Sequence, residues 1–236
     1  MKDPLVLLPA MMCDVGVFEH QISALSRDRA VIAAPVGQFE RIEEIASDLL
    51  DALPARFAVF GLSFGGLVGM ELMRRAPDRI TRICLMGCSP LAEAPVEAAA
   101  REPLMISARM GKLEEAMRGT LLPDHLAPGP GRIRVMGDVM RMAAALGPEV
   151  FVRQSRALQK RRDQQGTMRR AKIPTLIACG ELDTLVPPRR HHFLADLMPN
   201  AELQVIPGAG HLPPLEQPDA TLDMLRDWLA APLVLR

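Results

Sequence analysis

The sequence has few aromatic residues and no net charge, and both absences narrow its possible functions. Aromatic residues make up 3% of the 236 residues, with one Trp and no Tyr. This leaves little material for platforms on which nucleic-acid bases stack. Basic and acidic residues number 28 each, so the formal net charge is zero. Charge alone therefore favours neither nucleic acid nor a membrane surface as a partner, and we expect neither.

Cysteines are also few, and their spacing forms no metal-binding pattern. The chain has Cys13, Cys84, Cys88 and Cys179, with no C-x-x-C pair and no His or Cys cluster that completes a zinc site. Cys84 and Cys179 lie in apolar runs, which indicates buried, reduced thiols. We expect no bound metal and no cofactor.

Long apolar runs are missing as well. No stretch approaches the roughly 20 residues that span a bilayer. The run Leu5–Leu8 is too short for a signal peptide, follows Asp3-Pro4 and lacks a cleavage site. We therefore expect a cytoplasmic location. Hydrophobic residues nevertheless make up 49% of the chain, enough for a core that needs no disulfide or metal.

Short apolar runs alternate with helical patterns along most of the chain, which predicts an α/β fold. The predicted strands are Leu5–Leu8, Ala30–Ala33, Phe57–Phe60, Ile80–Met86, Thr175–Ala178 and Leu203–Ile206. They would form a mostly parallel sheet of about six strands with helices on both faces. The sheet domain would comprise residues 1–90 and 168–236.

The segment after the fourth predicted strand breaks this alternation. Residues 91–167 contain helical patterns only: Val96–Met110, Lys112–Arg118, Arg132–Leu146 and Glu149–Gln159. An all-helical insertion at this point predicts a small cap. It would cover the carboxyl ends of the strands, where open α/β sheets bind their ligands.

The sharpest motif is Gly61-Leu62-Ser63-Phe64-Gly65-Gly66, which lies between a predicted strand and a predicted helix. In that context G-x-S-x-G forms a tight turn that lifts the serine hydroxyl clear of the sheet. The motif is neither a Walker loop nor a G-x-G-x-x-G dinucleotide fingerprint. A glycine-rich turn that binds phosphate or nothing is the alternative interpretation.

A nucleophilic serine needs a histidine as base and an acid that orients it. His211 is the only one of five histidines in a short loop between a strand and a helix. His191 and His192 are expected at the surface, and His20 and His125 in structural or surface positions. Asp183 follows the preceding strand and is the predicted acid, with Glu181 as its competitor.

The chain order Ser63, Asp183, His211 resembles that of the α/β-hydrolase superfamily, in its compact esterase and lactonase-like branch. The matching segments are Gly61–Gly66, Gly180–Asp183 with Val186-Pro187, and Gly208–His211 with Glu216–Pro218. The resemblance implies an α/β-hydrolase fold and a catalytic triad of these three residues. It also implies an oxyanion hole formed by the backbone N–H groups of Met11 and Phe64.

The function that this resemblance implies is a serine hydrolase with a small-molecule acyl substrate. It would cleave a small carboxylic ester, lactone or thioester through an acyl-enzyme on Ser63. An acyltransferase, a lyase or a cofactor-free haloperoxidase of the same fold would keep the same triad. A ligand-binding or inactive relative would keep the fold. These alternatives stay open at the level of sequence.

Methionine is abundant, with 15 residues, and suggests an apolar pocket. The pocket candidates are Met12, Met105, Met110 and Met117, although ordinary helix packing explains them equally well. Basic residues gather between Lys160 and Lys172, where the cap returns to the sheet. They form either a solvated face or a site that attracts an anionic substrate, such as a carboxylate or an acyl-CoA.

Overall fold

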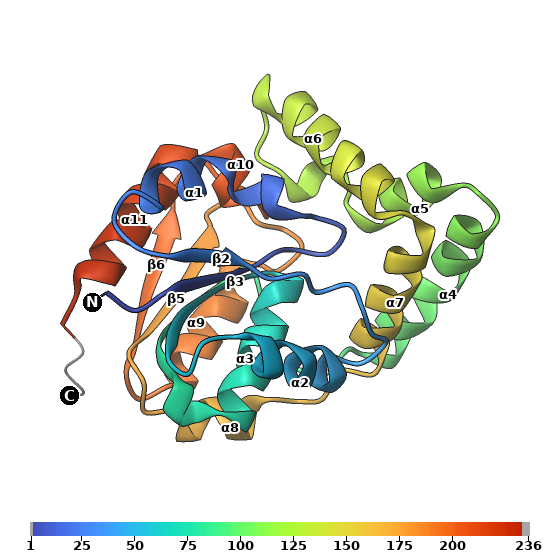
Figure 1. Ribbon diagram of the computed structural model, residues 1–236. Coiled ribbons are helices and arrows are strands. Elements are labelled where there is room, and N and C mark those ends of the chain that lie inside the picture. The colour runs from blue at the N-terminus through green and yellow to red at the C-terminus, as the bar shows by residue number, and fades with distance from the viewer. Residues whose placement is uncertain (1, 233–236) are drawn as a thin grey trace.

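A computed structural model describes residues 2–232 and contains one parallel sheet within them (Figure 1). Its strands are β1 (Leu5–Leu8), β2 (Val31–Ala33), β3 (Phe57–Leu62), β4 (Ile80–Met86), β5 (Thr175–Gly180) and β6 (Ala201–Ile206). Their order across the sheet is β2-β1-β3-β4-β5-β6, and every neighbouring pair is parallel. The predicted sheet is confirmed, with strand ends that differ from the prediction by two residues or fewer.

Helices cover both faces of this sheet. One face carries η1 (Val15–Phe18), α1 (Glu19–Leu25), α10 (Pro213–Glu216) and α11 (Pro218–Ala230), and the other carries α2 (Ile42–Ala52), α3 (Phe64–Arg75), α8 (Gln165–Arg170) and α9 (Pro188–Leu197) (Figure 1). Side chains of the central strands alternate between two cores. Leu5 and Leu7 join the first core, whereas Val6 and Leu8 join the second. This double burial explains why the strands read as unbroken apolar runs.

The chain between β4 and β5 is helical. It forms α4 (Pro95–Arg109), α5 (Leu113–Thr120), the short turn η3 (Pro123–His125), α6 (Gly131–Leu146) and α7 (Pro148–Gln159), followed by α8. Helices α4 to α7 lie together beside the sheet, on the right in Figure 1. These four helices overlap the four that the sequence predicts. Helix α8 was not predicted, because a six-residue segment with two arginines has no clear apolar period.

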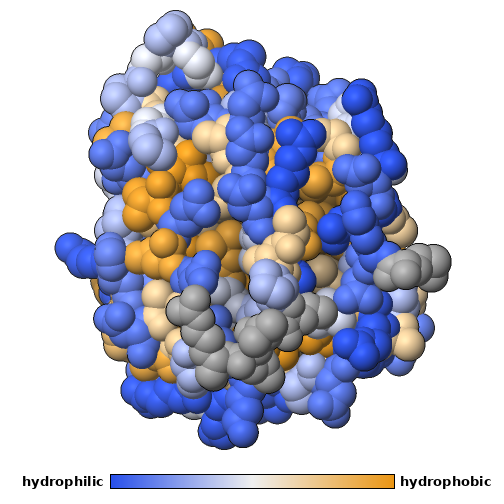
Figure 2. Space-filling view, turned by 90° about the vertical axis from the view of Figure 1, so that its left-hand side faces the viewer, coloured by the Kyte–Doolittle hydropathy of each residue, from blue (hydrophilic) through white to orange (hydrophobic). Residues whose placement is uncertain are grey.

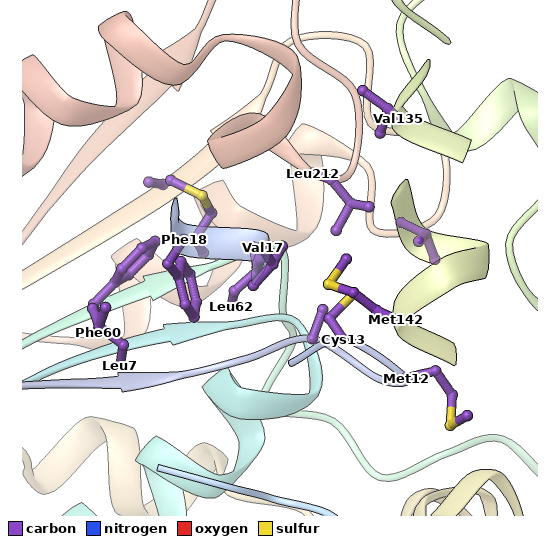
Figure 3. Close-up of a cluster of buried hydrophobic side chains, with 14 of the residues drawn as sticks. Leu7, Met12, Cys13, Val17, Phe18, Phe60, Leu62, Val135, Met142 and Leu212 are labelled. Carbon is purple, nitrogen blue, oxygen red and sulfur yellow. The ribbon is translucent and has the colours of Figure 1, made fainter. Parts of the chain in front are cut away.

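An apolar core joins the inserted helices to the sheet (Figure 3). Phe18 and Phe60 pack with their ring centroids 5.3 Å apart. The same buried cluster includes Val135 and Met142 of α6, together with Leu212. Burying one such side chain contributes about 1.5–3 kcal/mol, so this shared core fixes α6 against the sheet domain.

The four cysteines are buried and unpaired, which confirms the prediction made for Cys84 and Cys179. Burial raises the pKa of Cys13 and Cys88 to about 12, so both are neutral thiols near pH 7. No helix among residues 2–232 combines the length and the apolar character needed to cross a bilayer. The side of the molecule away from the inserted helices mixes hydrophilic and hydrophobic residues (Figure 2).

Candidate active site

The carboxyl ends of β3, β5 and β6 bring the three predicted residues together. Ser63 directly follows β3, and Asp183 and His211 lie in the loops after β5 and β6. His211 Nε2 lies 2.9 Å from Ser63 Oγ, and His211 Nδ1 lies 2.9 Å from Asp183 Oδ2. Both distances are hydrogen-bond lengths. The row is contiguous because parallel strands present their carboxyl ends at one edge of the sheet.

Ser63 sits in a backbone conformation that most residues avoid. Its φ is 51° and its ψ is −110°, a strain of about 1–3 kcal/mol that the surrounding turn must hold. The Ser63 N–H donates to the carbonyl oxygen of Met86 at 2.7 Å. A Cβ atom on Gly61 would lie 2.6 Å from the carbonyl oxygen of Gly65, and one on Gly65 would overlap the backbone of Leu8. The turn therefore requires glycine at both positions.

Asp183 is buried, and both of its carboxylate oxygens accept hydrogen bonds. Its Oδ1 atom accepts the backbone N–H groups of Leu185 and Val186, each at 2.9 Å. Burial alone raises the pKa of this carboxyl. The charge and hydrogen bond of His211 and the Val186 N–H outweigh that effect, and the pKa lies below its ordinary value. Asp183 is therefore an anion at neutral pH.

Within residues 2–232, the competing acid and the two histidines of α9 make no hydrogen bond to Ser63, Asp183 or His211. Glu181 accepts the Gly208 N–H at 3.1 Å and is exposed. His192 is exposed as expected, but the surface position predicted for His191 is wrong. His191 shares the inner face of α9 with Leu194, where both side chains are fully buried. Burial lowers the pKa of His191 to about 4, so this imidazole is neutral at pH 7.

A tight turn after β1 forms another wall of the site. The Cys13 N–H donates to the Ala10 carbonyl at 3.1 Å, and Met12 has a φ of 54°. The Met12 N–H donates to Gln154 Oε1 of α7 at 2.8 Å, which holds the turn from the inserted helices. The sequence carries no local signal for Gln154, because this contact joins residues 142 apart.

The two residues predicted to supply oxyanion donors border the same cavity as Ser63. Met11 and Phe64 both line it. Within residues 2–232, neither backbone N–H donates to a protein acceptor. Phe64 is the first residue of α3, where amides have no partner inside the helix and the helix dipole favours negative charge. Both amides are thus available to a ligand.

The cavity has a volume of about 440 Å³ and is lined mainly by apolar side chains. Of the four methionines predicted to form a pocket, only Met117 lines it. Met12 and Met105 pack inside the hydrophobic core instead. Met110 is 73% exposed, since it follows the last residue of α4. The helical pattern alone does not reveal which face of each inserted helix turns toward the cavity.

Glu216 links the inserted helices to the histidine loop, a role that the sequence does not reveal. Its Oε2 atom accepts the N–H of Gly210 at 2.9 Å and that of Ala127 at 2.6 Å. Its Oε1 atom accepts the N–H of Leu212 at 2.7 Å. A single carboxylate thus ties both neighbours of His211 to the segment that follows η3.

The predicted basic cluster divides between the surface and the cavity. Lys160 and Arg162 form ion pairs with Glu40 at 3.2 Å and with Glu43 at 2.7 Å. Arg161, between them, lines the cavity. The remaining basic residues of the cluster, Arg169, Arg170 and Lys172, are exposed. Most of the cluster is therefore a solvated face, and Arg161 is its one member that borders the site.

Comparisons with known proteins agree with this fold. The pimeloyl-acyl-carrier-protein methyl ester esterase of Neisseria meningitidis is 26% identical over 83% of this chain and 78% of its own length. A thermophilic esterase from Thermogutta terrifontis is 23% identical, with a TM-score of 0.85 over 97% of this chain and 90% of that one. The enol-lactonase of Burkholderia xenovorans is 24% identical, with a TM-score of 0.85 over 98% and 92%.

The sequence also matches a family described as the alpha/beta hydrolase fold. The match runs from residue 35 to residue 218 and so includes Ser63, Asp183 and His211. It covers the parallel sheet from β3 to β6 and all the inserted helices. The chain belongs to the alpha/beta hydrolase fold family.

Proposed function

We propose that this protein is a serine hydrolase that cleaves a small carboxylic ester, thioester or lactone. The observation that carries the proposal is the row of hydrogen bonds from Ser63 through His211 to Asp183. A serine hydroxyl is a weak nucleophile until a neighbouring base can take its proton. The row supplies that base and an anion that orients it.

In the proposed first step, His211 Nε2 accepts the Ser63 hydroxyl proton while Oγ attacks the acyl carbonyl carbon. Asp183 accepts the Nδ1–H of His211, which fixes the imidazole tautomer and stabilises the charged ring. The carbon–oxygen or carbon–sulfur bond of the substrate then breaks. The leaving group takes the proton from His211, and the acyl group stays on Ser63.

The tetrahedral intermediate carries a negative oxygen, and the free N–H groups of Met11 and Phe64 are its proposed donors. Removal of one such donor costs about 3–4 kcal/mol of transition-state stabilisation. In the second half of the reaction, His211 takes a proton from water. The resulting hydroxide attacks the acyl carbon, and the bond between that carbon and Ser63 Oγ breaks. His211 returns its proton to Oγ as the acid leaves, which restores the free enzyme. Residues 91–167 act as the cap that closes this cavity.

The name of a relative supports the class of substrate. The matching protein of Neisseria meningitidis is named as a methyl ester esterase, and the match covers most of both chains. The cavity of about 440 Å³ lies within the usual range of small-molecule sites. Its mainly apolar lining suits a short acyl group.

A fluorophosphonate probe and a panel of esters, lactones and thioesters test the proposal. The wild type and the exposed-serine control Ser26→Ala should be labelled and should hydrolyse members of the panel, whereas Ser63→Ala should do neither. Labelling that persists in Ser63→Ala contradicts the assignment of the nucleophile. A folded wild type that takes no label favours a binding protein, and labelling without hydrolysis of any panel member favours acyl transfer or lyase chemistry.

A further inference from the structure

One wall of the cavity carries a compact cluster of charges around Glu93. The Glu93 side chain is only 2% exposed. Its carboxylate accepts hydrogen bonds from Arg101. Arg101 Nε lies 3.0 Å from Oε1 and 2.9 Å from Oε2, and Arg101 Nη2 lies 2.7 Å from Oε1. The carboxylate also accepts Arg161 Nη1 at 2.9 Å. Two arginines from opposite ends of the inserted segment therefore share one buried carboxylate.

Each arginine keeps one terminal nitrogen without a protein acceptor. Arg161 Nε donates to the Leu91 carbonyl at 3.1 Å, which leaves Nη2 free within the described chain. Arg101 spends Nε and Nη2 on Glu93, which leaves Nη1 free within the same residues. The side chains are 20% exposed for Arg101 and 16% for Arg161, and both line the cavity that holds Ser63. A guanidinium has five donors, so both can still bind an acceptor.

The charges of this cavity wall favour the binding of an anion. Two guanidinium groups face the single buried carboxylate of Glu93, so these three groups together carry one net positive charge. Glu97 also lines the cavity and its charge acts on Arg161, but its side chain is exposed and accepts the Ala94 N–H at the start of α4. Burial lowers the pKa of Arg161, and Glu93 opposes that shift. A second carboxylate beside Arg161 would offset the cost of burying its charge.

We propose that Arg101 and Arg161 bind a carboxylate on the acyl part of the substrate while Ser63 attacks its ester, thioester or lactone carbonyl. The preferred substrate is then a half-ester, or the equivalent thioester or lactone, of a dicarboxylic acid. Planar guanidinium groups suit this role because they bind carboxylates through paired hydrogen bonds. The inference rests on the proposed function and specifies its substrate class.

Two p-nitrophenyl esters of glutaric acid test this subsite in catalysis. One keeps the distal carboxylate, and the other has it capped as a methyl ester. We expect the wild type to favour the free carboxylate in kcat/KM by about 10- to 100-fold, the range for hydrogen bonds to a charged group. Arg101→Gln and Arg161→Gln should each reduce this ratio of kcat/KM values by about tenfold. Arg101→Lys, which keeps the positive charge, should show a higher ratio than Arg101→Gln. Arg109→Gln, an exposed position on the same helix, should leave the ratio unchanged.

A wild type with no preference for the free carboxylate overturns the subsite but leaves the proposed function standing. A preference for the free carboxylate that persists in both glutamine variants also overturns the subsite, because the two arginines would then not cause it.

Calorimetric titration of Ser63→Ala with glutarate needs no turnover and separates the two proposals. We expect glutarate to bind to Ser63→Ala and to outcompete butyramide there. We expect its binding to the double variant Ser63→Ala/Arg161→Gln to be at least tenfold weaker. Failure of glutarate to bind contradicts the subsite even if the hydrolase proposal holds.

Discussion

At the scale of single residues, the hydrogen bonds of Asp183 support this residue, rather than Glu181, as the proposed acid. Asp183→Asn should lower kcat by about 10⁴-fold, because an amide favours the wrong imidazole tautomer. Glu181→Gln is the matched control and should change kcat little, since within residues 2–232 the Glu181 side chain hydrogen-bonds to the Gly208 N–H and not to His211. Hydrolysis of p-nitrophenyl acetate by both variants measures this. Equal rates for wild type and Asp183→Asn would reject Asp183 as the acid.

The depressed pKa of Asp183 also predicts how stability depends on pH. A carboxyl whose pKa is lower in the folded chain contributes stability above its unfolded pKa of about 3.9, and loses it as pH falls through the folded value. The wild type should therefore have a higher free energy of unfolding than Asp183→Asn at pH 7, and this difference should be smaller at pH 3. Urea unfolding at both pH values measures the difference. A difference that does not shrink in acid would contradict the assigned direction of the pKa shift.

At the scale of elements, the strand–turn–helix around Ser63 depends on close backbone contacts. Gly65→Ala places a methyl group against the backbone of β1, and we expect it to destabilise the protein by about 3 kcal/mol or to prevent folding. Gly137→Ala is the matched control on α6, where a Cβ meets nothing within 4 Å. It should stabilise the protein by about 0.5–1 kcal/mol through helix propensity. Chemical denaturation of both variants measures the contrast, and a harmless Gly65→Ala would refute the packing argument.

Local signals explain what could be predicted from the sequence. The strands are apolar runs bounded by turns because both faces of the sheet are buried, and the turn at Ser63 carries its own glycines. Long-range contacts explain what was missed. Gln154 and Glu216 act through partners that are remote in sequence, and the side of α4 that meets the cavity depends on how the inserted helices pack. Met105 and Met110 were therefore misplaced in a pocket, and Arg101 was not identified.

At the scale of the whole molecule, Glu216 joins the histidine loop to the inserted helices. Glu216→Gln replaces one acceptor oxygen with a donor that faces backbone N–H groups, so at least one hydrogen bond to a charged group is lost. We expect a decrease in Tm of about 5–10 °C, from about 1.5–3 kcal/mol per such bond, together with a lower kcat. Glu202→Gln, at an exposed position on β6, is the control. Calorimetric melting that shows the same Tm for both variants would mean that the link contributes nothing.

The central claim is that Ser63 carries the acyl group during turnover, and the most direct measurement is the mass of the enzyme quenched during hydrolysis of p-nitrophenyl acetate. Our account predicts that the wild type gains one acetyl group and that peptide mapping places it on Ser63. It also predicts that Asp183→Asn gains the group more slowly and that Ser63→Ala does not gain it. Turnover by Ser63→Ala, or an acetyl group mapped to another residue in the wild type, would contradict the account.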